Sequence, residues 1–143
     1  MDKIYVVYWS STGNTQAMAD AIGKGIMNAG KDAAVLYVGE ASLEELKNAK
    51  VFALGCPAMG AEELEETEME PFVTEVEGFA AGKTIVLFGS YDWGDGQWMR
   101  DWVERMQKSG ANVLNGEGLI CHETPDPSVL INAEAIGKQL AMI

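Results

Sequence analysis

Cysteine and histidine are scarce in this chain. Two cysteines and one histidine occur among 143 residues, too few for the disulfide framework of a small secreted domain. Cys56 ends one apolar segment and Cys121 lies in another, so we expect both to be reduced, small hydrophobic side chains. His122 follows Cys121 directly, and neighbouring side chains of a strand point to opposite faces, which argues against a Cys–His catalytic pair. One histidine and two distant cysteines also make no zinc-ligand pattern.

Long hydrophobic segments are missing as well. The apolar run near the amino terminus covers only residues 4–9, which is too short for a signal peptide or a membrane span. We therefore expect a cytoplasmic protein that makes no contact with a membrane. No linker or internal repeat divides the 143 residues, and 48% hydrophobic with 22% charged residues predicts one globular domain.

Positive charge is the third scarce feature. Twenty-two acidic residues against ten basic ones give a net charge of −12. Such a surface opposes binding to nucleic acid and favours a partner with a basic surface. Six glutamates without a base occur within residues 61–70. A run of this kind is usually a solvated face, and steering of a partner is its functional alternative.

Short apolar runs do alternate regularly with segments of helical period. The pattern predicts strands at residues 3–9, 33–38, 51–56, 84–90 and 113–121, the last with an interruption near Asn115, Gly116 and Gly118. It predicts helices at residues 14–29, 42–48, 68–77, 96–109 and 128–141. Five such units indicate an α/β fold with a parallel sheet between helices. In the fourth helix, Trp98 and Trp102 stand at a spacing that favours core packing.

Ligands of such open sheets bind beyond the carboxyl ends of the strands, where three loops carry informative residues. The first, Y-W-S-S-T-G-N-T (8–15), offers hydroxyls and backbone N–H groups but no Lys or Arg, so it suits a phosphate monoester better than a triphosphate. The second is P-A-M-G-A-E-E-L (57–64). The third, S-Y-D-W-G-D-G (90–96), presents Tyr91 and Trp93 as a stacking surface for a flat ring. Capped turns and an aromatic plug over the sheet end are the structural alternatives.

In these three loops the sequence resembles the flavodoxins, most of all the short-chain flavodoxins of anaerobic bacteria. The likeness extends over almost the whole chain, including E-L-E-E-T-E-M-E-P-F after the second loop and W-M-R-D-W after the third. The fifth strand region also lacks a long insertion. The resemblance implies one domain over residues 1–143, a three-layer sandwich with a five-stranded parallel sheet in the order 2-1-3-4-5 and helices on both faces.

The resemblance also implies a function. It indicates a monomeric, low-potential one-electron carrier that binds FMN noncovalently, has no substrate of its own, and shuttles electrons between redox proteins with basic docking surfaces. The FMN-binding residues that it implies are Ser10, Ser11, Thr12, Gly13, Asn14, Thr15, Pro57, Ala58, Met59, Gly60, Ala61, Glu62, Ser90, Tyr91, Asp92, Trp93 and Gly94.

Roles within this set follow from the same resemblance. Residues 10–15 would hold the phosphate, and Met59 and Trp93 would cover the two faces of the isoalloxazine, with Tyr91 beside them. Glu62 would accept a hydrogen bond from the flavin N3–H, and the peptide at 60–61 would respond to protonation at N5. Backbone N–H groups of residues 92–94 would approach N1 and O2. The chain departs from the common pattern at three of these positions, which hold Ser11, Ala61 and Asp92.

Two other classes share parts of this pattern. A flavin or quinone reductase that uses NAD(P)H would need a second pocket, and neither G-D-G-Q-W-M at Gly94 nor G-E-G-L-I-C at Gly116 completes the motif G-x-G-x-x-G. A signalling receiver domain of similar topology would need a phospho-acceptor Asp at the end of the third strand. There the chain has Gly55, Cys56 and Pro57.

Overall fold

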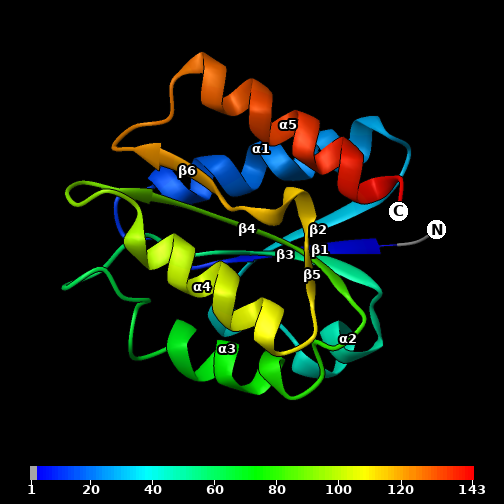
Figure 1. Cartoon of the computed structure of the whole chain (residues 1–143). Coiled ribbons are helices and arrows are strands. Elements are labelled where there is room, and N and C mark those ends of the chain that lie inside the picture. Colours follow the sequence, from blue (N-terminus) through cyan, green and yellow to red (C-terminus); the bar gives the residue numbers. More distant parts are fainter. Residues whose placement is uncertain (1–2) are drawn as a thin grey trace.

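A parallel β-sheet forms the middle layer of the molecule (Figure 1). The computed structural model describes residues 3–143. The strands of the sheet are β1 (Lys3–Tyr8), β2 (Asp32–Tyr37), β3 (Val51–Gly55), β4 (Thr84–Tyr91), β5 (Asn112–Val113) and β6 (Leu119–His122). They lie in the order β2-β1-β3-β4-β5, β6 also pairs with β4, and every pairing is parallel. The predicted strand order is confirmed.

The edge strand beside β4 is interrupted, as the sequence predicts. β5 and β6 both pair with β4, and the 3-10 turn η2 (Leu114–Gly116) separates them. Asn115 and Gly116 have φ values of 66° and 73°, a backbone that cannot continue a strand. A Cβ atom on Gly118 would lie 2.3 Å from the sulfur of Met99. Glycine at this position lets the chain re-enter the sheet beneath α4.

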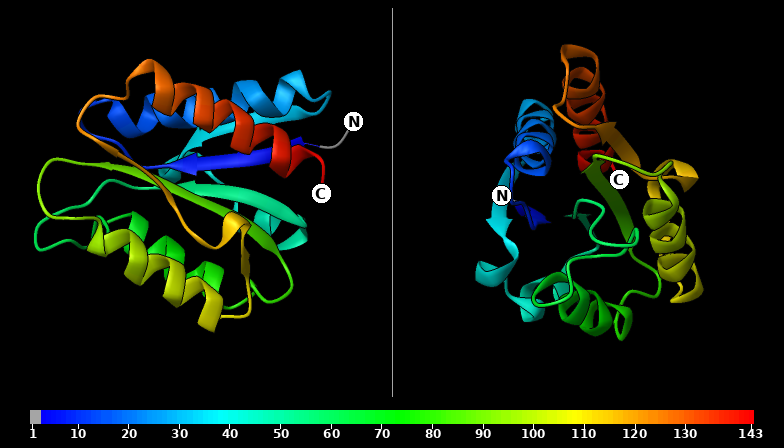
Figure 2. Two further views of the ribbon diagram at one scale, coloured as in Figure 1. Left: turned by 45° about the horizontal axis from the view of Figure 1, so that its top comes forward. Right: turned by 90° about the vertical axis from the view of Figure 1, so that its left-hand side faces the viewer.

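Five helices cover the two faces of the sheet (Figure 2). α1 (Asn14–Asn28) and α5 (Pro127–Ala141) lie on one face, and α2 (Leu43–Asn48), α3 (Met69–Glu77) and α4 (Gln97–Lys108) lie on the other. The short turn η1 (Val38–Glu40) follows β2. Within residues 3–143, no helix is long and apolar enough to cross a membrane.

Each face of the sheet has its own hydrophobic core. Alternate residues of β1 serve the two cores, because Val7 packs toward α2, α3 and α4, whereas Val6 packs toward α1 and α5. Trp98 and Trp102 are 2% and 1% exposed, so their predicted role in core packing is confirmed. The indole N–H of Trp98 donates to the carbonyl of Cys56 at 3.1 Å, which attaches α4 to the end of β3.

The backbones of α1 and α5 are in direct contact through glycine. A Cβ atom on Gly25 would lie 1.9 Å from the carbonyl oxygen of Glu134, and one on Gly137 would lie 2.1 Å from that of Ile22. Only a residue without a side chain allows this approach.

The first strand begins close to where the last helix ends. Figure 1 shows both ends of the chain on one side of the molecule, at the amino ends of the strands. Lys3, Ile4, Leu140 and Ile143 line one hollow there, with a volume of about 290 Å³. The loops at the carboxyl ends of the strands lie at the opposite edge.

Candidate functional site

Four loops meet at the carboxyl edge of the sheet, which faces the viewer in the right-hand view of Figure 2. We call them loop 1 (residues 9–13), loop 2 (56–68), loop 3 (92–96) and loop 4 (123–126). Loops 1 to 3 contain most of the predicted site residues. The remainder lie in the last residues of β4 and the first of α1, which border the same edge.

Loop 1 is organised by its own hydroxyls. Ser10 Oγ accepts from the backbone N–H of Gly13 at 3.2 Å and of Gln16 at 3.4 Å, and Thr12 Oγ1 accepts from that of Asn14 at 3.4 Å. Each hydroxyl still has its own O–H to donate. Gly13, the N-cap residue of α1, has a φ of 93°. The loop therefore offers hydroxyl donors at a helix amino terminus, where the backbone dipole favours an anion.

Thr15 differs from the rest of the predicted phosphate set. It is 1% exposed, its Oγ1 lies 3.0 Å from Ser90 Oγ, and it accepts from the Ser90 N–H at 3.3 Å. Ser90 in turn accepts from the Ala58 N–H at 3.0 Å through its carbonyl. These bonds connect the start of α1, the end of β4 and the start of loop 2 beneath the edge.

The tip of loop 2 is a tight hairpin. Met59 and Glu63 exchange two backbone hydrogen bonds of 2.8 Å, and between them Gly60 and Glu62 have φ values of 48° and 56°. A Cβ atom on Gly60 would meet nothing within 4 Å. Glycine is therefore favoured at this position by the positive φ of the backbone, and not by a close contact with a neighbouring atom.

Glu62 joins loop 2 to loop 3. Its Oε1 accepts from the backbone N–H of Gln97, the first residue of α4, at 3.0 Å. A Cβ atom on Gly94 would lie 2.7 Å from the Glu62 carboxyl carbon, so the two loops touch. A carboxylate has about four acceptor sites, and this bond leaves capacity for a further donor.

The acidic run of residues 61–70 is not one solvated face. Glu65 is 6% exposed. Its carboxylate accepts from the Glu68 N–H at 2.7 Å, the Met69 N–H at 3.0 Å, the Thr67 N–H at 2.8 Å and the Thr67 hydroxyl. Burial raises the pKa of Glu65, but the hydrogen bonds from Thr67, Met69 and Glu68 outweigh it and lower the pKa. The carboxylate thus fixes the end of loop 2 to the start of α3.

Two further glutamates of the run have partners. The Tyr37 hydroxyl donates to Glu68 Oε1 at 2.5 Å, and this bond raises the pKa of Tyr37 to about 12. Glu70 pairs with Arg105 of α4 at 2.5 Å. Glu63 and Glu66 are exposed. The interpretation of the run as a solvated face is therefore wrong for Glu65, which the fold buries. The exposure of Glu63 and Glu66 agrees both with a solvated face and with steering of a partner.

Loop 3 presents an exposed indole. Trp93 is 61% exposed, and Gly94 follows it with a φ of 85°. Tyr91, at the end of β4, packs beneath the loop with its ring centroid 5.6 Å from that of Trp98. Arg100 donates to the backbone carbonyl and the carboxylate of Asp95, at 3.0 Å each. The apex of the loop is exposed while its end is held by α4.

Loop 4 and the end of β6 contact loop 3 through residues that the sequence did not assign to the site. His122 Nε2 lies 3.0 Å from the backbone carbonyl oxygen of Asp92, and the Glu123 N–H donates to the Tyr91 carbonyl at 2.8 Å. The register of the sheet pairs Tyr91 with His122. Knowledge of where the interrupted edge strand resumes would have been needed to find this contact.

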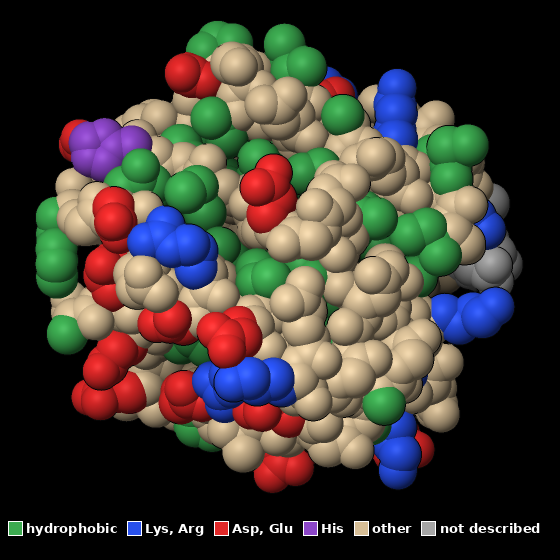
Figure 3. Space-filling model, viewed as in Figure 1, with side chains coloured by type: hydrophobic (Ala, Val, Ile, Leu, Met, Phe, Trp, Pro, Cys, Tyr) green, Lys and Arg blue, Asp and Glu red, His purple; other side chains and the backbone are tan. Residues whose placement is uncertain are grey.

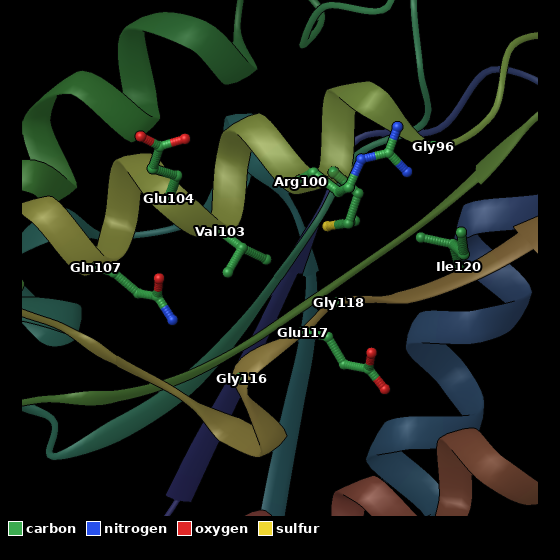
Figure 4. A pocket seen from close by; sticks show the side chains of 10 residues that line it. Gly96, Arg100, Val103, Glu104, Gln107, Gly116, Glu117, Gly118 and Ile120 are labelled. Atoms are coloured by element: carbon green, nitrogen blue, oxygen red, sulfur yellow. The ribbon is translucent and has the colours of Figure 1, made fainter.

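A separate groove of about 500 Å³ lies between α4 and the segment before β6 (Figure 4). Arg100 and Glu104 project from α4 at its rim, and Glu117 projects from the opposite segment. None of residues 10–15, 57–62 or 90–94 lines it. The hydroxyl donors and the exposed indole converge instead at the carboxyl edge, which is the candidate cofactor site.

The fold, the hydroxyl donors at the start of α1 and the exposed indole define an open-sheet α/β protein that binds its ligand beyond the carboxyl ends of the strands. A family model described as flavodoxin matches residues 6–135, and the chain belongs to the flavodoxin family. It is 50% identical over 138 residues to a flavodoxin of Clostridium beijerinckii, covering 96% of this chain and 99% of that protein. It is 42% identical over 123 residues to a flavodoxin of Megasphaera elsdenii, covering 86% and 88% respectively.

Solved structures agree. The solution structure of the two-electron reduced Megasphaera elsdenii flavodoxin has a TM-score of 0.86 at 38% identity and covers 98% of this chain and 99% of that chain. The resemblance to short-chain flavodoxins is confirmed. The protein is an FMN-binding electron carrier that interacts with redox proteins, and the reductase alternative is not favoured.

Proposed function

We propose that loop 1 holds the FMN phosphate, with Ser10 to Asn14 as its main donors. Exposed hydroxyls at Ser11 and Thr12 and the start of α1 support this assignment, and a monoester needs no lysine. Thr15 has a supporting part, because its hydroxyl is engaged with Ser90 and acts by fixing the loop against β4.

Trp93 and Met59 cover the two faces of the isoalloxazine. The support is the exposure of a large apolar side chain: an indole that is 61% exposed at a loop apex gains by stacking on a flat ring. Met59 is half-buried at the base of the hairpin, and its flexible thioether adapts to a ring surface. Tyr91, Pro57 and Ala58 complete the wall beside the ring.

Loops 2 and 3 form the hydrogen bonds to the polar edge of the ring. Glu62 uses its remaining acceptor capacity for the flavin N3–H, the 60–61 peptide faces N5, and the backbone N–H groups of residues 92–94 face N1 and O2. FMN supplies the chemistry, which is the uptake and release of single electrons. The protein sets how readily FMN takes up and releases electrons, through stacking, hydrogen bonds and nearby negative charge.

We propose that the whole chain acts as one domain, a monomeric low-potential carrier in the cytoplasm without a substrate of its own. Its partners are redox proteins with basic docking surfaces. Figure 3 shows acidic side chains gathered on the side of the molecule where the loops lie, and Glu63, Glu66, Asp92 and Asp95 are exposed there. Opposite charges steer the encounter of two proteins.

The comparison of FMN with riboflavin tests this assignment. We expect one FMN per chain, with its fluorescence quenched by Trp93, and a weaker affinity for riboflavin. Riboflavin leaves the loop 1 donors without their anion, a loss of about 1–3 kcal/mol or roughly 5- to 150-fold in Kd. Fluorescence titration of the apoprotein measures both constants. Equal constants would refute the role of loop 1.

A further inference from the structure

The one histidine of the chain bridges two loops at the cofactor edge. His122 stands opposite Tyr91 in the β4–β6 register, with ring centroids 5.1 Å apart. Its Nε2 lies 3.0 Å from the Asp92 carbonyl oxygen. Its Nδ1 lies 3.5 Å from Oε1 of Glu123. Both ring nitrogens therefore face oxygen atoms.

The chemistry of these partners determines which ring nitrogens of His122 carry a hydrogen. A carbonyl oxygen only accepts, so Nε2 carries a hydrogen and donates it to Asp92. An ionised Glu123 also only accepts, so Nδ1 satisfies it only when the ring is an imidazolium. The neutral ring keeps the Asp92 bond and loses the second one. The bond to Asp92 is therefore the one that the ring makes in either protonation state.

The bridge acts at the end of loop 3 that α4 does not hold. Arg100 grips Asp95 at the α4 end of the loop, and Glu62 accepts from Gln97 just beyond it. On the β4 side, the loop begins at Asp92, whose carbonyl receives the His122 bond. The part of loop 3 between Asp92 and Asp95 contains Trp93 with its exposed indole.

We propose that His122 is a positioning residue for FMN: it holds the Asp92 peptide so that Trp93 and the neighbouring N–H groups are prearranged for the ring. The inference rests on the proposed role of loop 3. It assigns to β6 and loop 4 a part in cofactor binding, although the sequence marks neither of them as part of the site.

Three groups contact His122. The Tyr91 ring packs on it from β4, the backbone carbonyl of Asp92 faces it from loop 3, and the Glu123 carboxylate faces it from its own segment. Asp126, farther along loop 4, accepts from a backbone N–H of α5.

Two variants of His122 separate the hydrogen bond from the packing of the ring. His122→Ala removes the donor. His122→Gln keeps an N–H that reaches the Asp92 carbonyl but lacks the imidazole ring that packs on Tyr91. Because the side chain is exposed, both variants are expected to fold, and urea unfolding of the apoproteins checks this. The measurement is the FMN dissociation constant of wild type and both variants under the same conditions.

We expect His122→Ala to raise the Kd roughly 5-fold, because a loop that is only partly in its binding conformation binds more weakly. His122→Gln should recover most of that loss, because its amide N–H still donates to the Asp92 carbonyl.

Two results would overturn the proposal. The first is a Kd for His122→Ala equal to that of wild type. The second is a Kd for His122→Gln as high as that of His122→Ala, which would assign the effect to ring packing on Tyr91. Failure of the wild type itself to bind FMN would instead refute the proposed function.

Discussion

Glu65 is the residue whose replacement tests the architecture of loop 2 most directly. In Glu65→Gln, the side-chain carbonyl can keep the bonds from Glu68 and Met69, but an NH₂ group replaces the oxygen that accepts from Thr67. A buried backbone N–H left without its acceptor costs about 1–3 kcal/mol. Loss of negative charge at the start of α3 adds about 0.3–1 kcal/mol. We expect the free energy of unfolding to fall by about 2–3 kcal/mol at pH 7.

Urea unfolding of the apoprotein, followed by tryptophan fluorescence, measures this change without a contribution from the cofactor. With a slope of about 2 kcal/mol per molar urea, the midpoint should fall by roughly 1–1.5 M. Glu66→Gln is the matched control, because it removes the same charge from the neighbouring, exposed position. A midpoint for Glu65→Gln that coincides with that of Glu66→Gln would refute the reasoning.

The pH dependence of the same difference has a definite sign. The pKa of Glu65 is lowered in the folded protein, so the ionised carboxylate stabilises the fold above the unfolded pKa of about 4.3. That contribution is lost as the pH falls through the lower, folded pKa. The difference in the free energy of unfolding between wild type and Glu65→Gln should therefore be constant from pH 8 to about pH 5. It should become smaller only below pH 5. A gap that closes between pH 8 and pH 6 would point to another group.

Three further predictions concern the loops and the surface. Gly60→Val should lower the free energy of unfolding by about 1–2 kcal/mol because φ is 48° there, whereas Gly60→Asn should cost clearly less; equal losses in urea titrations would exclude the backbone explanation. Electron transfer to a basic redox partner should slow as salt rises from 0.01 to 0.3 M, and the double substitution of Glu63 and Glu66 by Gln should weaken that dependence. Stopped-flow rates that are independent of salt would show that these carboxylates are only solvated. Asp92→Asn should raise the potential for the second electron by at most about 40 mV, which corresponds to a partly screened interaction of about 1 kcal/mol. If a spectroelectrochemical titration at low salt shows a change for Asp92→Gly but none for Asp92→Asn, loop geometry and not charge is responsible.

Much of the fold could be predicted from the sequence because periodicity and composition agree locally. The run at residues 51–56 has no polar side chain, and the run at residues 84–90 has polar side chains only at its two ends, as expected of strands covered on both faces. The glycines near residue 116 mark the break in the edge strand. Trp98 and Trp102 stand one helical turn apart, and both are buried. These features depend on neighbours in the chain, which a sequence shows.

The part that could not be predicted depends on contacts between distant segments. Thr15 looks like another hydroxyl of the phosphate loop until β4 places Ser90 against it. Glu65 looks like its neighbours, although its position shortly before the start of α3 is compatible with a cap. The bond between His122 and Asp92 needs a strand register that begins only after an irregular turn. Pattern analysis has no access to these pairings.

The meeting of β1 and α5 at the amino edge has a practical consequence for handling this carrier. A linker attached at either end would leave from the face opposite loops 1 to 3, because Lys3 and Ile143 border the same hollow there. Molecules tethered through that face to an electrode or to a second enzyme would all present the electron-exchanging edge outward. The same chain could be cut in an exposed turn and its old ends joined by a short linker, giving a permuted carrier whose cofactor edge remains free.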